Sequence, residues 1–200
     1  YLDDYFIPQV CELVEKYDID GIWVDGDCWS VDIDYRADAI TAFEQKMGIS
    51  LGGNVPTKKG DPYFEELLEF TREKYRKFLN YYVDTLHAKY PNLEICVNWA
   101  FSDHMPEPVC TNIDFLSGDL DNQKGVYSSR YAGRALALQG KPWDLMSWGF
   151  RHNIYGTPIT PPKHPLQLMQ EAAAVIALGG AYQNNILQFS DGAHDVDRLV

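Results

Sequence analysis

The 200-residue sequence predicts an α/β fold, and more narrowly the later part of a (β/α)8 TIM barrel. Short apolar segments alternate with helical patterns along the chain, which is typical of parallel strands covered by helices on both faces. Nearly every predicted strand ends in polar or aromatic residues, and barrel enzymes carry their catalytic groups at these ends. A complete barrel takes about 250 residues. Because only five strands can be counted in residues 1–200, we interpret this chain as a single domain whose first strands lie upstream.

The first half of the chain contains one strand between helices. Apolar residues at helical spacing precede the short buried run that ends at Asp25. Gly48 is placed to cap the next helix, and the pair Asp61-Pro62 is typical of an N-cap followed by proline in the first turn. The predicted elements are helix 6–17, strand 21–25, helix 32–47 and a long helix beginning at Asp61-Pro62.

The second half repeats the strand-helix pattern. Each apolar segment is short enough for a buried strand, and each is separated from the next by a loop or by a helical pattern. The predicted strands are 93–98, 113–117, 143–148 and 182–189, and the predicted helices are 128–138 and 165–178.

Composition excludes several classes of protein. Seventeen basic residues stand against twenty-nine acidic ones, and the resulting net charge of -12 argues against a nucleic-acid partner. A hydrophobic content of 46% supports a substantial core, which excludes a disordered chain. No apolar run reaches the roughly 18 residues of a membrane helix, so we expect no membrane partner. A homo-oligomer is compatible with the sequence.

No cofactor or metal is expected from the motifs. The sequence has no glycine-rich nucleotide-binding turn, and its five histidines show no metal-ligand spacing. Its four cysteines form no C-x-x-C pair, which favours a reducing compartment such as the cytoplasm.

The most informative segment surrounds Asp25. This carboxylate ends a buried strand and precedes glycine, so it is expected at the barrel mouth, with Trp23 and Trp29 as walls for a sugar ring. A glycosidase needs such a carboxylate near the anomeric carbon. The alternative is that Asp25, or more readily Asp27, only caps the following helix.

A second carboxyl group is needed to protonate the leaving group. Asp119 is the preferred candidate because it lies just beyond a predicted strand, whereas Glu107 and Asp121 lie in loops. An acid from an upstream residue also stays open. The predicted substrate-binding residues, which combine hydrogen-bonding groups with aromatic rings at strand ends, are Trp23, Trp29, Asn98, Trp99, Trp148, Arg151 and His152.

Three segments resemble the α-L-fucosidases of glycoside hydrolase family 29. They are residues 17–26 (YDIDGIWVDG), 142–150 (PWDLMSWGF) and 184–192 (NNILQFSDG), and their order and spacing agree with that family. The chain has Asn98-Trp99-Ala100 where family 29 has Asn-Asp-Arg, which makes it closer to family 151 and related hypothetical glycosyl hydrolase barrels.

The resemblance implies a retaining exo-glycosidase that acts on terminal α-L-fucosides, with a carbohydrate as its partner. Asp25 would be the nucleophile, and Asp119 would complete the pair as acid and base. The alternatives are another barrel glycosidase, such as a β-galactosidase-like enzyme, and a carbohydrate-binding barrel without catalysis. A further alternative is an inactive piece, because two unpaired sheet edges would make the chain poorly soluble alone.

Overall fold

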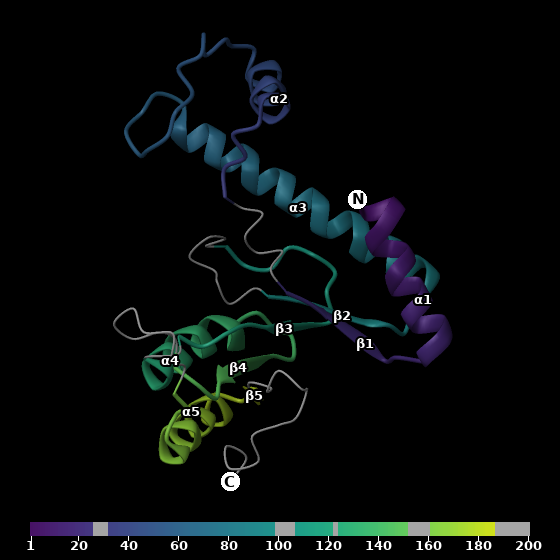
Figure 1. Ribbon diagram of the computed structural model, residues 1–200, viewed down its shortest axis with the longest axis vertical. Helices are drawn as coiled ribbons and strands as arrows, with labels where there is room; N and C mark the ends of the chain where they lie inside the picture. The colour runs from purple at the N-terminus through teal and green to yellow at the C-terminus, as the bar shows by residue number, and fades with distance from the viewer. Residues whose placement is uncertain (26–31, 99–106, 122–123, 152–160, 187–200) are drawn as a thin grey trace. The chain divides into compact units, whose positions relative to one another are not determined.

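The computed structural model describes residues 1–25, 32–98, 107–121, 124–151 and 161–186 (Figure 1). The described chain forms two compact units. The first holds the described residues of Tyr1–Leu93 and Ser102–Asn112, and the second holds those of Glu94–Phe101 and Ile113–Val200.

The described part of the first unit consists of helices and one short strand. A proline in the first turn of α1 costs no hydrogen bond there, and Asp18 ends the helix in a left-handed conformation with φ 51°. The strand follows directly, as the sequence predicts. The elements are η1 (Leu2–Phe6, a π-helix), α1 (Ile7–Tyr17), β1 (Gly21–Val24), α2 (Ala37–Met47) and α3 (Phe64–Lys89).

Helix α2 begins at Ala37, later than the predicted start at residue 32. Before it, the carboxylate of Asp34 accepts a hydrogen bond of 3.0 Å from the backbone N–H of Arg36. Such a local contact competes with helix formation, and Arg36 is extended with φ -63° and ψ 148°. The predicted C-terminal cap is confirmed, because Gly48 is left-handed with φ 65°.

The predicted start of the long helix is wrong. Asp61 Oδ2 accepts hydrogen bonds from the backbone N–H groups of Thr57 at 2.9 Å and Lys58 at 3.1 Å, so it caps the preceding turn. Tyr63 then takes a left-handed conformation with φ 65°, and α3 begins only at Phe64. None of the helices in the described part of the chain combines the length and apolar composition of a membrane span.

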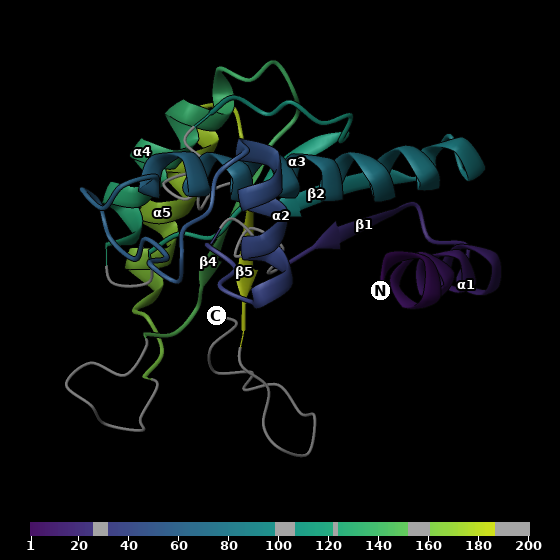
Figure 2. The same ribbon diagram turned by 90° about the horizontal axis from the view of Figure 1, so that it is seen from above.

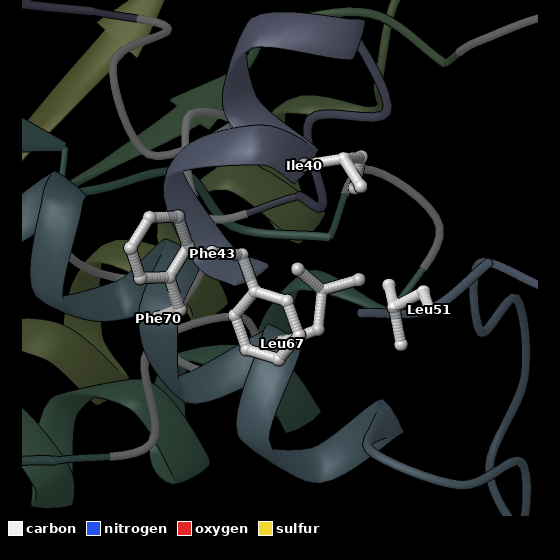
Figure 3. Packing of buried hydrophobic residues seen from close by; sticks show 5 residues of the cluster. All are labelled: Ile40, Phe43, Leu51, Leu67 and Phe70. Atoms are coloured by element: carbon white, nitrogen blue, oxygen red, sulfur yellow. The ribbon is translucent and has the colours of Figure 1, made fainter. Parts of the chain in front are cut away.

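A small hydrophobic core joins α2 to the first half of α3 (Figure 3). Phe43 of α2 is fully buried and meets Phe70 of α3 edge to face, with ring centroids 5.6 Å apart. Burying a side chain of this size contributes about 1.5–3 kcal/mol. The cluster consists of Ile40, Phe43, Leu51, Leu67 and Phe70.

The second unit alternates strands and helices. Helices α4 and α5 pack against each other and against β4, and they lie on one side of β4 and β5 in both views (Figures 1 and 2). The elements are β2 (Glu94–Asn98), β3 (Phe115–Ser117), α4 (Gly125–Ala137), β4 (Asp144–Trp148), α5 (Pro165–Ala177) and β5 (Ala181–Asn185).

All strand pairs of this unit are parallel among the described residues. Asn98 of β2 pairs with Ser117 of β3, and Trp148 of β4 pairs with Asn185 of β5. Parallel bridges from Leu116 to Trp143 and from Asp119 to Met146 join β3 to β4. The strands therefore follow one another in chain order, and their carboxyl ends lie at one edge, where parallel sheets place their sites.

The two faces of these strands differ in character. Leu116 and Leu145 are fully buried on the face toward the helices, as expected for a parallel sheet under a helical layer. Successive side chains of a strand point to opposite faces. The other face carries the polar residues Ser117, Asp119 and Asp144 and the ring of Trp148, with Met146 between the last two, and it holds the candidate site.

Candidate active site

Three of the predicted site residues meet at the ends of neighbouring strands in the second unit. Asn98 is the last residue of β2, Trp148 is the last residue of β4, and Asp119 lies just beyond β3. The Asn98 Nδ2 group donates to Asp119 Oδ2 at 2.6 Å, and Trp148 Nε1 donates to Asp119 Oδ1 at 2.9 Å. Each carboxylate oxygen of Asp119 therefore holds a side chain from an adjacent strand.

The backbone on both sides of Asp119 fixes its direction. Met146 of β4 donates its N–H to the carbonyl of Gly118 at 2.8 Å and accepts from the N–H of Leu120 at 2.9 Å. Asp119 lies opposite Met146, and strand alternation puts Trp148 on the same face as Met146. The hydrogen bond between the side chains of Asp119 and Trp148 follows from this register.

The contacts on Asp119 decide what this carboxyl group can do. Two N–H donors stabilise the ionised carboxylate, because a donated hydrogen bond favours the charged form. Asn98 is only 1% exposed, whereas Asp119 and Trp148 are half-buried and can meet a ligand. The group is suited to act as a base, a nucleophile or a partner for positive charge. To act as an acid it must first gain a proton.

A second polar layer lies further back on the same strands. Asp144, at the start of β4, accepts a hydrogen bond from Ser117 of β3 on one oxygen. Its other oxygen accepts from Gln183 Nε2 of β5 at 2.6 Å. None of these three residues is predicted as a site residue from the sequence. The sequence does hold a signal for Ser117, because it lies two residues before Asp119 and is therefore expected on the same face of the strand.

The candidates of the first unit are Trp23 and Asp25. Trp23 lies in β1, and its indole N–H is buried without a hydrogen-bond partner among the described residues. Asp25 directly follows β1 and is exposed. Three further predicted residues, Trp29, Trp99 and His152, lie outside the described part of the chain.

Glu107, an alternative acid, has a structural role in the first unit. Both of its oxygens accept hydrogen bonds from Arg76 at 3.0 Å. Hydrogen bonds from Arg76 to Glu69 and then to Glu107 raise the pKa of the guanidinium group. Asp121, the other alternative, accepts from the backbone N–H of Lys124 at 2.9 Å, just before α4. Neither contact is that of a general acid.

Arg151 lies among groups that the sequence analysis did not identify. Its guanidinium donates to Gln167 Oε1 at 2.8 Å, and Gln167 in turn donates to Glu171 Oε1 at 3.0 Å. Glu171 also pairs with Lys163, and both side chains are fully buried. A lone glutamate in an alanine-rich helix gives no signal of burial, which explains why sequence reasoning missed it.

The described residues include no group of three or more His, Cys, Asp or Glu side chains arranged to hold a metal ion.

Comparison with known proteins adds a similarity in fold. No protein-family model matches the sequence, and no curated protein matches it. Bee venom hyaluronidase matches the structure with a TM-score of 0.50 and 9% sequence identity. The chain is similar in fold to a glycoside hydrolase. The match covers 88% of this chain and 67% of that one, and at this identity it concerns the fold alone.

Proposed function

We propose that this chain belongs to the catalytic barrel of a retaining exo-glycoside hydrolase that removes terminal α-L-fucose. The observation that carries the proposal is the position of Asp119, which is held at the end of β3 by Asn98 and Trp148 from the ends of β2 and β4. The similarity in fold to a glycoside hydrolase supports the reaction class. The resemblance of residues 17–26 to the fucosidase signature supports the sugar.

The reaction proceeds in two displacements. Asp25 attacks the anomeric carbon while the glycosidic C–O bond breaks, and Asp119 gives its proton to the leaving oxygen. The product is a glycosyl ester on Asp25. Asp119, now ionised, takes a proton from water, and the water oxygen attacks the anomeric carbon and releases Asp25. The mechanism requires the two carboxyl groups to lie about 5–5.5 Å apart.

The contacts of Asp119 fit the second displacement directly. There it is an anionic base, which is the form that the N–H groups of Asn98 and Trp148 stabilise. In the first displacement Asp119 carries a proton, which it donates to the leaving oxygen of the substrate. The substrate is thus expected to change the hydrogen bonding of Asp119 when it binds.

A carbohydrate-binding barrel without catalysis is the second candidate. The observation that favours it is the same pair of contacts, because a carboxylate held on both oxygens can simply accept hydrogen bonds and orient its neighbours. This candidate predicts that a fucoside binds without being cleaved. Binding and hydrolysis must therefore be measured on the same preparation.

Hydrolysis of an aryl α-L-fucoside by the full chain, with Asp25→Ala, Asp119→Ala and Asp38→Ala beside it, tests the proposal. Asp38 is an exposed carboxylate, 75% accessible, and serves as the matched control. We expect both site variants to lose turnover and the control to keep it. Added azide should then restore turnover in both site variants. The product should be fucosyl azide, of inverted configuration in Asp25→Ala and of retained configuration in Asp119→Ala.

Other results would change the assignment. Cleavage of β-galactosides or hyaluronan in place of fucosides would keep the reaction class and replace the sugar. Binding of fucose without turnover of any glycoside in the parent protein would contradict the enzyme and favour the binding barrel. Full activity in Asp119→Ala would remove this residue from the mechanism.

A further inference from the structure

A fully buried ion pair lies behind the candidate site, on the face of β4 that is turned toward the helices. Lys163 Nζ contacts Glu171 of α5 at 3.1 Å and 3.0 Å on its two oxygens, and both side chains have no exposed surface. The same ammonium group donates to Ser147 Oγ at 3.0 Å, and Ser147 also donates to Glu171. The three donors of the ammonium group thus meet three acceptors.

Lys163 binds both residues that flank Trp148. Its side chain holds the hydroxyl of Ser147, and its backbone N–H donates to the carbonyl of Gly149 at 2.9 Å. Gly149 is held further by its own N–H, which donates to the carbonyl of Asn185 at 2.7 Å. The residues before and after Trp148 are therefore both held by hydrogen bonds at the end of β4.

Strand alternation connects this anchor to the candidate site. Ser147 points toward the helices, so its neighbour Trp148 points to the opposite face, where its N–H meets Asp119. We propose that Lys163 and Glu171 are positioning residues that fix Trp148 against Asp119. The catalytic part of this inference rests on the proposed function, whereas the structural part does not.

A gain in stability does not explain why a charged pair, Lys163 and Glu171, is buried at this position. Removing two charges from water costs free energy that their attraction often fails to return, and apolar side chains of similar volume can replace a buried pair without loss. A charged pair does provide direction, because its hydrogen bonds allow few arrangements. Gln167 adds a further donor to Glu171 Oε1 at 3.0 Å, which restricts the carboxylate more.

Helix α4 leaves room for this carboxylate at one glycine. A Cβ atom on Gly125 would lie 1.9 Å from Glu171 Oε1, so an alanine there must displace the carboxylate or the helix. Gly125→Ala therefore disturbs the anchor while every charge is kept. It provides a test that is independent of removing the ion pair.

The test compares Lys163→Met, Glu171→Met and the double variant with the parent. The matched control is the double variant Lys16→Met with Glu12→Met, an exposed ion pair on α1. The readouts are the urea midpoint, kcat and KM with an aryl glycoside, and the indole N–H signals in a nitrogen-labelled NMR spectrum. The chain has five tryptophans, and Trp148→Phe assigns the signal of Trp148.

We expect each single variant to lower the urea midpoint, because it leaves an unpaired buried charge. The double variant should regain most of the midpoint, yet its Trp148 signal should stay shifted and its kcat should fall at least about tenfold with little change in KM. Gly125→Ala should shift the same signal. A Trp148 signal unchanged in both the folded double variant and Gly125→Ala would overturn the proposal.

The signal and the activity separate two kinds of failure. If the parent cleaves no glycoside, the proposed function is wrong, but the NMR signal still decides whether Lys163 and Glu171 position Trp148. If the parent is active and the folded double variant keeps both its kcat and its Trp148 signal, the positioning role is wrong and the proposed function is untouched.

Discussion

The indole N–H of Trp148 donates a hydrogen bond to Asp119 Oδ1 at 2.9 Å, between the ends of β4 and β3. The ring of Trp148 also lies beside that of Phe150, with centroids 5.5 Å apart and planes tilted by 30°. One tryptophan thus combines an apolar surface with a donor aimed at a carboxylate. In a sugar site, the ring can contact the substrate while the N–H sets the direction of Asp119.

The variant Trp148→Phe removes the donor and keeps an aromatic ring. Because hydrogen bonds to charged groups are worth about 1.5–3 kcal/mol, we expect a lower free energy of unfolding, together with lower kcat. Urea denaturation of Trp148→Phe, Asp119→Ala and the double variant gives a double-mutant cycle, which measures the coupling free energy between the two residues. Strict additivity of the two variants would show that the hydrogen bond contributes nothing.

Gly180, just before β5, lies against the ring of Trp143. A Cβ atom at this position would lie 2.4 Å from Cη2 and Cζ3 of the tryptophan, which is only 7% exposed. We expect Gly180→Ala to lower the free energy of unfolding by about 1–3 kcal/mol, since overpacking a core costs this much. Adding Trp143→Phe should recover part of the loss. A melting temperature for Gly180→Ala equal to that of the parent would contradict this packing.

Gly48 isolates a backbone effect from packing. Its φ is 65°, and a Cβ atom there would meet nothing within 4 Å. A side chain therefore costs only the left-handed conformation, about 1–2 kcal/mol for alanine and less for asparagine. Thermal unfolding of Gly48→Ala and Gly48→Asn checks this difference. Equal losses in the two variants would mean that the cap is not left-handed.

Lys163 should make stability depend on pH in the alkaline range. Burial lowers its pKa from the ordinary 10.5, and Glu171 opposes the lowering. Between the lowered value and 10.5 the unfolded chain binds more protons, so this group makes stability rise with pH. We expect the unfolding free energy of the parent, relative to Lys163→Met, to rise as pH approaches 10.5. A difference that stays constant or falls with pH would contradict the shift.

The strand ends could be predicted from the sequence because parallel strands bring their carboxyl ends together. Asn98, Asp119 and Trp148 are predicted on this ground, and the structure places their side chains in contact. The cap at Gly48 was predictable for a similar reason, since a glycine after an apolar helical stripe has few other roles. The barrel itself and the sugar stay predictions.

Contacts between side chains distant in the sequence were not predictable. Glu107 reads as a loop charge, and its pairing with Arg76 depends on how the chain returns to α3. Nothing in the sequence predicts that Lys163 and Glu171 are buried, because burial of a charge is visible only when its partner is known. The predicted start of α3 was wrong for a local reason, because the carboxylate of Asp61 caps the preceding turn instead of the helix.

The most direct measurement is an NMR time course of an aryl α-L-fucoside with the parent chain and with Asp119→Asn. The account predicts that α-fucose is the first sugar released by the parent, before mutarotation, because two displacements retain the anomeric configuration. Asp119→Asn should release it far more slowly. First release of β-fucose, or equal rates in the two proteins, would contradict the retaining mechanism with Asp119 as its acid and base.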